Sequence, residues 1–211
     1  MTEQETRAEI VAQARRMNAL GINQGTSGNI SVRHGEGMLI TPSAIPYEEM
    51  RPDQIVPMDL DGAWTGTCKP STEWRFHLDI LRARPDAGAV VHTHAMFCTT
   101  LAIARRDIPA CHYMIGLFGG DSVRCAPYAT FGTAELAAHA LRALEGRCAC
   151  LLANHGMIVM GTTLARAMWL AVELEALAKQ YYHSLAIGGG TMLTAAEMAD
   201  ARRSFQGYGR A

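Results

Sequence analysis

The sequence predicts an α/β or α+β fold in one domain. Three observations lead to this prediction: predicted helices and strands alternate irregularly, the first strands form a hairpin, and no internal repeat is present. The length of 211 residues fits one domain, or two small ones at most. Hydrophobic residues make up 49% of the chain and charged residues 18%, a balance that is typical of globular proteins and argues against disorder.

The first half of the chain is expected to supply helices, a hairpin and a buried strand. Apolar residues recur at helical spacing over residues 3–20, and the pattern ends at Gly21, a common residue at helix ends. A second helix is expected to start within 69–74 and to run to about Arg84, because Pro85 cannot continue it. Short apolar runs bounded by turn residues predict strands at 30–32, 38–40, 55–59 and 88–91.

The second half alternates longer helices with short strands. The spacing of apolar residues predicts helices at 95–104, 133–145, 163–186 and 195–205. Strands are expected at 149–152 and 156–160, and residues 112–131 are expected to be irregular with pieces of strand. Three glycines at 188–190 form the one linker-like stretch, so we expect a C-terminal tail from about residue 188 within a single domain that spans 1–211.

The charge balance and the N-terminal segment exclude several classes of protein. With 19 Lys and Arg against 20 Asp and Glu, the chain has no overall positive field, so we expect neither a nucleic acid nor a membrane partner. The N-terminus is polar and mixed in charge, unlike a signal peptide, and no run approaches the roughly 18 apolar residues of a membrane span. The six cysteines form no C-x-x-C pair and are interpreted as reduced thiols, so we expect a cytoplasmic protein.

His92 and His94 are the first candidate metal ligands. On a strand, side chains two residues apart point to the same face, so the two imidazoles would converge on one point. His155 lies at a turn between two apolar strands and would add a third nitrogen ligand of the kind that zinc prefers. Three protein ligands leave one coordination position open, which is the pattern of catalytic zinc sites. The alternative is that these are strand-end histidines that hydrogen-bond to the backbone.

Glu73 lies in the expected first turn of the second helix. Its functional interpretation is a general acid or base beside the metal. The alternative is an acidic residue that only complements the helix dipole. His77, four residues later, could share a helix face with Glu73, but it is interpreted as an ordinary packed or solvated histidine.

Three segments of small residues, at 26–29, 41–44 and 70–72, are candidates for an anion pocket. Gly28 would let the backbone approach a phosphate, and the N–H groups that follow Ser71 at the helix start offer hydrogen-bond donors. Because hydroxyl-rich turns are common, each segment taken alone is also explained as a simple turn or cap. The phosphate-binding G-x-x-x-x-G-K-[ST] loop and the dinucleotide-binding G-x-G-x-x-G motif are both absent from the sequence.

Taken together, these segments resemble the class II aldolase/adducin family. The stretches Ala-Pro-Tyr-Ala-Thr-Phe-Gly-Thr at 126–133 and His-Tyr-Met-Ile at 112–115 are more specific than the His-x-His pair. The resemblance covers essentially the whole chain and is greatest to the members that cleave L-fuculose 1-phosphate. The other matching segments are 23–31, 39–47, 71–77, 90–94, 108–111 and 151–156.

The resemblance implies a zinc-dependent aldolase with a single-domain, three-layer α/β/α fold around a largely antiparallel central sheet. Members of the family are usually cyclic homotetramers whose sites lie at subunit interfaces. The implied reaction cleaves a phosphorylated sugar, a ketose 1-phosphate of the L-fuculose 1-phosphate type, to dihydroxyacetone phosphate and an aldehyde. The implied ion is Zn²⁺, with Mn²⁺ or Co²⁺ as alternatives.

The positions that match the functional residues of the family fall into four groups. The implied metal ligands are His92, His94 and His155. The implied catalytic residues are Glu73 and Tyr113, of which the tyrosine reaches the site from a neighbouring subunit. The implied phosphate-binding residues are Gly28, Asn29, Ser43, Ala44, Ser71 and Thr72. Phe131 and Tyr208 match residues near the aldehyde end of the substrate.

Two departures from the family pattern concern the shape of the site. The family usually has glycine at position 44, and Ala44 is expected to tighten the pocket or to demand φ below zero. Leu117 and Phe118 replace smaller residues, so we expect an aldehyde pocket of different shape.

Three alternatives to the L-fuculose 1-phosphate reaction stay open. The first is a salvage aldolase for 5-methylthioribulose or 5-deoxyribulose 1-phosphate, which Leu117 and Phe118 favour. The second is an L-ribulose-5-phosphate 4-epimerase, which uses similar metal and phosphate sites. The third is a non-catalytic, adducin-like binding module, against which the intact histidines and Glu73 argue.

Overall fold

One seven-stranded sheet forms the centre of the molecule, in the order β3-β2-β1-β4-β7-β6-β5. The computed structural model describes residues 1–207 of the chain. The strands are β1 (Asn29–His34), β2 (Gly37–Ile40), β3 (Val56–Asp59), β4 (Ala89–Thr93), β5 (Arg124–Ala126), β6 (Ala149–Leu152) and β7 (Gly156–Gly161). Among these strands every pairing is antiparallel except that of β5 with β6, so the sheet is mixed but largely antiparallel, as expected.

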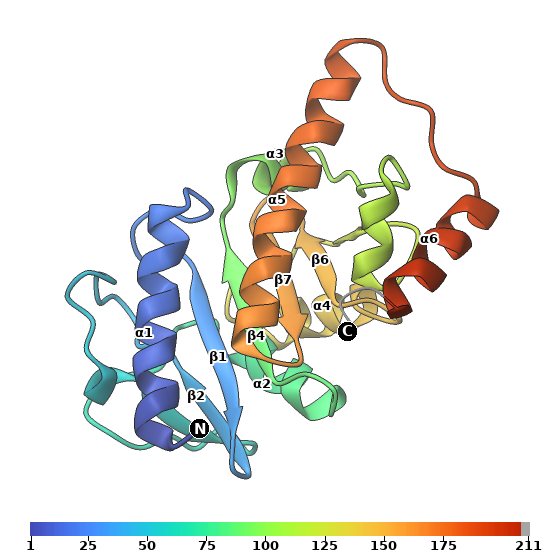
Figure 1. Cartoon of the computed structure of the whole chain (residues 1–211). Helices are drawn as coiled ribbons and strands as arrows, with labels where there is room; N and C mark the ends of the chain where they lie inside the picture. The colour runs from blue at the N-terminus through green and yellow to red at the C-terminus, as the bar shows by residue number, and fades with distance from the viewer. Residues whose placement is uncertain (208–211) are drawn as a thin grey trace.

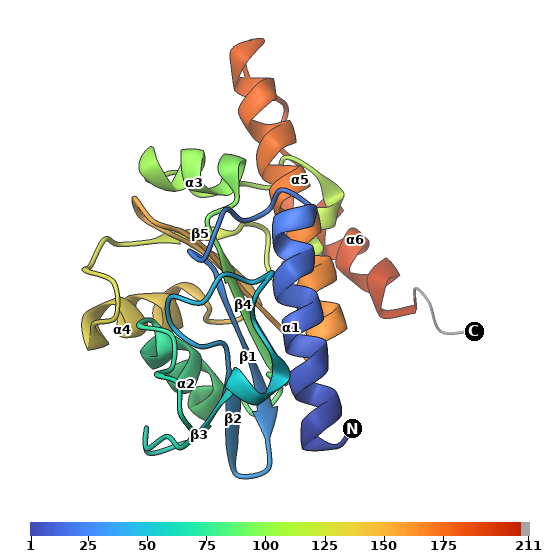
Figure 2. The same cartoon turned by 90° about the vertical axis from the view of Figure 1, so that its left-hand side faces the viewer.

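Helices cover both faces of the sheet and give the three layers that the resemblance implied. They are α1 (Glu3–Ala19), α2 (Trp74–Ala83), α3 (Met96–Ile103), α4 (Ala134–Ala143), α5 (Leu164–Ala186) and α6 (Ala195–Gly207), with 3₁₀ segments η1 (Pro52–Gln54) and η2 (Tyr113–Phe118). Figure 1 and Figure 2 show α1, α5 and α6 on one side of the sheet and α2 and α4 on the other. α3 and η2 pack into the same core as α1 and α5.

The central strand β4 shows why both helical layers are needed. All of its residues are buried, with Val90 in the core under α2 and α4 and Val91 in the core under α1 and α5. Successive residues of a strand point to opposite faces, so a strand that is covered on both sides is apolar over most of its length. β4 nevertheless ends in two polar residues without exposure, His92 and Thr93. Buried polar groups need partners, and these residues lie where the candidate site is built.

Helix α2 starts at Trp74, at the late end of the range that the sequence suggested. The preceding segment instead runs beside an earlier loop, with an antiparallel bridge between Pro42 and Pro70. Proline has no backbone N–H and favours extended backbone before it, which suits this pairing better than a helical turn. Glu73 therefore lies immediately before the helix and not in its first turn.

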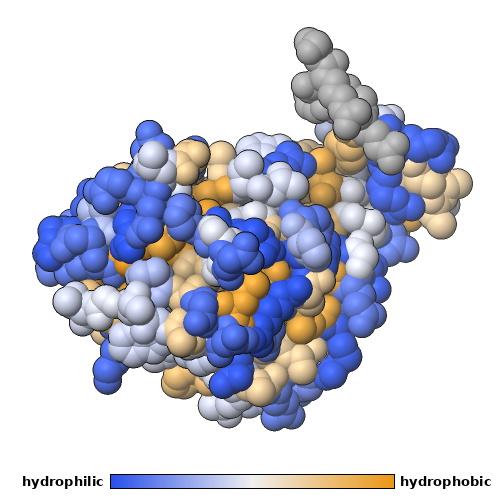
Figure 3. Space-filling model, turned by 90° about the horizontal axis from the view of Figure 1, so that it is seen from below, coloured by the Kyte–Doolittle hydropathy of each residue, from blue (hydrophilic) through white to orange (hydrophobic). Residues whose placement is uncertain are grey.

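The remaining predicted elements are present, with ends shifted by about two residues, a usual uncertainty for element boundaries. The stretch 112–131, expected to be irregular with pieces of strand, contains η2 and β5. No helix among residues 1–207 is both long and apolar enough to cross a bilayer. The face seen in Figure 3 mixes hydrophilic and hydrophobic residues, so apolar side chains occur between polar ones on this side.

Candidate active site

Three strand ends bring the candidate residues to one edge of the sheet. Asn29, the first residue of β1, is paired in register with His92 near the end of β4. Strand β7 starts directly after His155 and pairs with β4 through Met157 and Thr93. Because these neighbouring strands are antiparallel, the end of β4 lies beside the starts of β1 and β7. Residues that are far apart in the sequence meet there.

The three histidines and Glu73 form one cluster. One possible ligand atom of each residue lies within 4.8 Å of the others. The ring centroids of His92, His94 and His155 are 4.8 to 5.0 Å apart. His94 follows the last residue of β4, but its ring still converges with that of His92. The rings meet as the spacing predicted, and their role as metal ligands stays a prediction.

The unpaired atoms of this cluster fit a divalent cation. His92 Nδ1 lies 2.8 Å from the carbonyl oxygen of Met157, which can only accept, so in the neutral ring Nδ1 carries the proton and Nε2 is a free lone pair. Within residues 1–207, His92 Nε2, His94 Nε2 and Glu73 Oε1 are buried and have no hydrogen-bond partner. Buried lone pairs that face one another are unfavourable, and a cation between them satisfies all of them. His92 therefore combines a hydrogen bond to the backbone at Nδ1 with an unpaired Nε2 that faces the cluster.

Glu73 is buried against the histidines, with a relative exposure of 6%. Glu73 is the N-cap residue of α2, but its side chain makes no capping hydrogen bond to the helix. Oε1 lies 3.0 Å from His155 Nε2 and Oε2 lies 3.2 Å from His92 Nε2. Burial raises the pKa of this carboxyl, but the histidines His92 and His155 outweigh burial and lower its pKa below the ordinary value. An ionised carboxylate beside a cation site can accept and return a proton there.

His94 is neutral at physiological pH, and its segment is held by α5. Burial, assisted by the rings of His92 and His155, lowers the pKa of His94 to about 4, so the ring can offer a lone pair. Helix α3 begins two residues later without a capping side chain of its own. The carboxylate of Glu175 on α5 accepts hydrogen bonds from two N–H groups in the first turn of α3 at 2.8 and 2.9 Å. This contact holds the start of α3 next to His94.

Two of the three segments that were expected to bind phosphate, 26–29 and 70–72, contribute residues to the pocket beside the cluster. The backbone N–H of Ser43 donates to Lys69 at 2.9 Å, and that of Ser71 donates to Thr41 at 3.0 Å, so these two amides are already used. Thr72 is exposed and lines a pocket of about 330 Å³ that also contains Glu73, His94 and His155. The other residues that line this pocket are Thr26, Ser27, Tyr128, Ala129, Phe131 and Asn154.

Gly28 and Asn29 connect the first loop to the cluster. A Cβ atom at Gly28 would lie 2.7 Å from the carbonyl oxygen of His92, so only glycine permits this close approach to β4. Asn29 is 3% exposed, and its amide nitrogen donates to Glu73 Oε2 at 3.0 Å. One N–H of this amide is therefore used by Glu73.

The expectation that an alanine at position 44 demands φ below zero is wrong. Ala44 has a φ of 60°, in the left-handed region that costs a residue with a side chain about 1–2 kcal/mol. The loop is held in this shape by the bridge between Pro42 and Pro70 and by the hydrogen bond of Ser43. The pairing of the two loops therefore outweighs the local preference of alanine.

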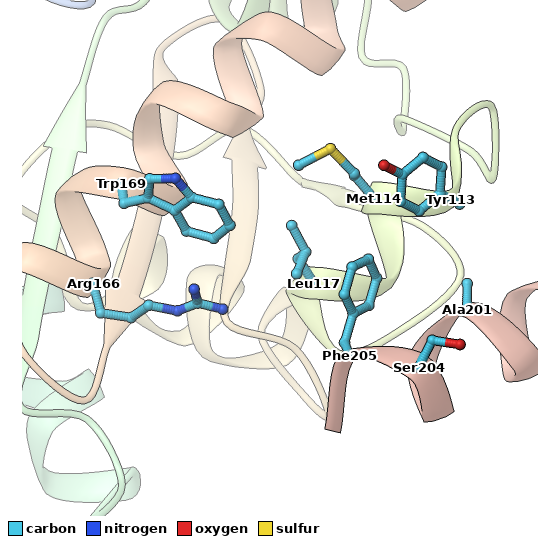
Figure 4. A pocket seen from close by; sticks show the side chains of 8 residues that line it. All are labelled: Tyr113, Met114, Leu117, Arg166, Trp169, Ala201, Ser204 and Phe205. Carbon is cyan, nitrogen blue, oxygen red and sulfur yellow. The ribbon is translucent and has the colours of Figure 1, made fainter. Parts of the chain in front are cut away.

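Tyr113 lies outside the histidine cluster of its own chain. It is 52% exposed and lines a groove of about 760 Å³ between η2, α5 and α6, together with Leu117, Trp169 and Phe205 (Figure 4). None of these residues lines the pocket that contains Glu73. A role for Tyr113 at the cluster therefore requires a second copy of the chain.

The residues expected near the aldehyde end have different positions. Phe118 is fully buried in the core under α1 and α5, so it does not reshape a substrate pocket by lining it, which corrects that expectation. Phe131 is 63% exposed and lines the pocket of Glu73 beside Tyr128. Tyr208 lies outside the described residues.

Two residues near the cluster were not recognised as part of the site from the sequence. His77 is fully buried and hydrogen-bonded to Ser31 and Asn29, so it is packed but not solvated. The sequence feature that could have placed His77 near the site is its four-residue spacing from Glu73, which is typical of one helix face. Asn154 has a φ of 56° next to His155, and a non-glycine residue in this region often marks a functional turn.

Comparison with known proteins gives matches along most of the chain. A sequence model described as the class II aldolase and adducin N-terminal domain matches residues 8–182. A 5-methylthioribulose-1-phosphate/5-deoxyribulose-1-phosphate aldolase of Rhodospirillum rubrum is 55% identical over 95% of this chain and 90% of that protein. An L-fuculose phosphate aldolase of Escherichia coli is 48% identical over 95% of this chain and 94% of its own length. A solved structure named L-fuculose 1-phosphate aldolase matches with a TM-score of 0.93, at 38% identity, over 96% of each chain.

Proposed function

The chain belongs to the class II aldolase and adducin family and is an aldolase, and from this premise we propose that it cleaves a ketose 1-phosphate to dihydroxyacetone phosphate and an aldehyde. The observation that carries the proposal is the buried cluster of three imidazoles and Glu73 with unpaired atoms that face one another. Relatives that are named as aldolases set aside the non-catalytic, adducin-like alternative.

His92, His94 and His155 would hold the metal ion, which we propose to be Zn²⁺, with Mn²⁺ or Co²⁺ as alternatives. Three neutral imidazole nitrogens with an open position are the ligand set that catalytic zinc sites use. When bound, the ion supplies a Lewis acid for the carbonyl and hydroxyl oxygens of the substrate and takes up part of the charge that develops as the C3–C4 bond breaks.

Proton transfer is the work of two side chains in this proposal. The partner subunit's Tyr113 accepts the proton of the C4 hydroxyl group at its phenol oxygen and passes its own hydroxyl proton to water as the C3–C4 bond breaks, so that C4 becomes the aldehyde carbon. The Glu73 carboxylate takes up a proton from water and then delivers it to C3, from a position between the histidines and Asn29. Before the reaction the carboxylate is ionised, so it is ready to accept the proton that it later returns.

The phosphate group is placed beside this cluster. We assign its binding to Asn29, Ser43, Ser71 and Thr72, with backbone contacts from Gly28 and Ala44. The support is that the segment with Ser43 is paired with the segment that leads to Ser71 and Thr72, and that Thr72 lines the pocket of Glu73 together with Thr26 and Ser27. Binding energy from a phosphate that does not react orients the bond to be broken.

Two sugars are candidate substrates. The 55% identical relative acts, by its name, on 5-methylthioribulose or 5-deoxyribulose 1-phosphate, and the 48% identical relative acts on L-fuculose phosphate. The exposed rings of Tyr128 and Phe131 in the pocket offer an apolar surface, which suits the terminal methyl group of L-fuculose and the methyl or methylthio group of the ribulose sugars alike. The name of the 55% identical relative supports the 5-substituted ribulose 1-phosphates as the second candidate beside L-fuculose 1-phosphate.

A coupled assay tests this function. Dihydroxyacetone phosphate is measured through NADH oxidation by glycerol-3-phosphate dehydrogenase, with a panel of ketose 1-phosphates, before and after treatment with a chelator. We expect release from one of the two candidate sugars, loss of release with the chelator, and recovery on addition of Zn²⁺. L-Ribulose 5-phosphate is added to the panel, and its turnover without release of triose phosphate would instead indicate a 4-epimerase. An unchanged rate in chelator would contradict the metal assignment.

The oligomeric state and the location are part of the same proposal. We propose a homotetramer in the cytoplasm with sites shared between subunits. The support is the exposed position of Tyr113, away from the cluster of its own chain. Sedimentation velocity of the purified protein measures the assembly directly.

A further inference from the structure

A chain of buried hydrogen bonds leads from the core of the protein to Glu73. It runs from Ser31 on β1 through His77 on α2 and Asn29 on β1 to the Glu73 carboxylate. Ser31 and His77 have no exposed surface, and Asn29 and Glu73 are 3% and 6% exposed. The mechanism proposed above gives His77 no role.

We propose that His77 is a positioning residue that orients the Asn29 amide, so that Glu73 is held through Oε2 and keeps Oε1 for the reaction. The inference rests on the proposed function, because it assigns a role within the same site. His77 is too deeply buried to touch a substrate, so it acts only through Asn29.

The donor and acceptor groups of each partner determine the direction of every hydrogen bond in this chain of hydrogen bonds, which we call the relay. An ionised carboxylate only accepts, so the Asn29 amide must turn its nitrogen to Glu73 Oε2, at 3.0 Å. The amide oxygen then faces His77 Nε2 at 2.5 Å, and because this oxygen also only accepts, Nε2 must carry the proton. His77 Nδ1 is left as an acceptor for the hydroxyl group of Ser31 at 2.8 Å. All three hydrogen bonds therefore point towards the carboxylate.

The opposite arrangement is unfavourable. If His77 carried its proton on Nδ1, the lone pair of Nε2 would face the amide oxygen of Asn29. The amide could then relieve this repulsion only by turning over, which would bring its oxygen against the carboxylate of Glu73. The position of one proton on the buried His77 ring thus determines whether the amide nitrogen or the amide oxygen of Asn29 faces the Glu73 carboxylate.

The surroundings of His77 hold its ring in place. It stacks on Phe76 with ring centroids 4.7 Å apart, and both residues belong to α2, the helix that Glu73 precedes. Burial, with the neighbouring His92, lowers the pKa of His77 to about 3, so the ring is neutral. Ser31 and Asn29 lie two residues apart on β1 and therefore face the same side of the sheet.

Nitrogen NMR of the metal-loaded enzyme, labelled with ¹⁵N-histidine, tests the direction of the relay without any substrate. The His77 signals are assigned by their loss in His77→Gln, with the exposed His183→Gln as the matched control. We expect a neutral His77 ring with a slowly exchanging proton on Nε2. A proton on Nδ1, or a charged ring at pH 7, overturns the proposal.

Kinetics of the metal-loaded variants test the consequence. His77→Phe keeps a buried ring but removes the donor, so we expect kcat to fall roughly 10- to 100-fold with unchanged metal content and a KM within about threefold. His77→Gln returns an amide N–H to the same region and should recover most of this loss. Equal loss in both variants, full activity of His77→Phe, or loss of metal together with kcat overturns the proposal.

The two proposals fail in different ways. If the unaltered enzyme cleaves no ketose 1-phosphate, the proposed function is wrong, and the NMR result still decides the direction of the relay. If the enzyme cleaves its substrate and His77→Phe does so equally well, only the role of His77 is wrong.

Discussion

The two oxygens of Glu73 have different surroundings. Oε2 accepts a hydrogen bond from Asn29 at 3.0 Å, while Oε1 has no hydrogen bond and lies 3.0 Å from His155 Nε2. An oxygen without a donor loses no hydrogen bond when it takes up a proton. This asymmetry suits a carboxylate that accepts and returns one proton in each turnover, and it leads to the first prediction.

Glu73→Gln should retain bound metal but lose cleavage by roughly 100-fold or more, because the amide is similar in shape and cannot transfer the proton. His92→Ala is the contrasting variant, since it removes a nitrogen ligand and should lose the metal and the activity together. Elemental analysis and the triose phosphate assay, applied to both proteins, separate the two effects. A Glu73→Gln enzyme with the unaltered rate would contradict the role assigned to this carboxylate.

Ala44 is strained in the loop beside the cluster, with a φ of 60°. Glycine removes the strain, about 1–2 kcal/mol, but adds roughly 0.5–1 kcal/mol of entropy to the unfolded chain. Ala44→Gly should therefore raise the free energy of unfolding by about 0.5 kcal/mol, and Ala44→Val should lower it, because a branched side chain tolerates this region least. Urea denaturation measures the free energy of unfolding of both variants. A higher value for Ala44→Val than for the unaltered protein would contradict the backbone strain at position 44.

At the scale of the elements, the site is a product of strand ends. β1, β4 and β7 meet at one edge of the sheet, and the short turn between β6 and β7 carries His155 to the end of β4. This turn lies against β4 with little free space. The position of the histidine therefore depends on how closely the first residue of β7 approaches its neighbours.

Gly156 is the residue at which this approach is closest. A Cβ atom there would lie 2.5 Å from the carbonyl oxygen of Thr93, 3.0 Å from the ring of His94 and 3.3 Å from that of His92. Gly156→Ala should therefore weaken metal binding by about 10- to 100-fold, the range seen when the supports of metal ligands are lost. Gly190→Ala is the control, because the space around Gly190 is open. Competition with a zinc-binding dye measures the affinity, and equal affinities in the two variants would contradict the prediction.

At the scale of the whole molecule, the buried, neutral His77 makes the free energy of unfolding depend on pH. Burial, with the neighbouring His92, lowers the pKa of His77 from 6.5 to about 3, so between these values the unfolded chain binds a proton that the folded chain does not. The stability from this group is complete above pH 6.5 and falls as the pH drops towards 3, by up to about 1.4 kcal/mol per pH unit. Urea denaturation of the metal-free protein between pH 4 and 6 measures this effect. We expect the free energy of unfolding to fall less steeply with decreasing pH in His77→Gln than in the unaltered protein. Equal slopes would contradict a neutral, buried His77.

The shared site gives a second prediction at this scale. If Tyr113 completes the cluster of a neighbouring subunit, Tyr113→Phe and Glu73→Gln each inactivate every site of their own assemblies. Mixed assemblies, formed by denaturing and refolding the two variants together, then contain some sites with both residues intact. We expect activity to return on mixing and refolding, measured by release of triose phosphate. No recovery in proven mixed assemblies would place both residues in the same subunit's site.

The sequence by itself determined the features that depend on short-range patterns. Apolar periodicity placed the helices and strands, the two-residue spacing placed His92 and His94 on one face, and the segment around Glu73 marked a candidate carboxylate. Only the tertiary structure decided the strand order that brings His155 to His92, the relay through His77, and the left-handed backbone of Ala44. These features depend on contacts between segments that are distant along the chain, and local spacing carries no information about which distant segments will meet.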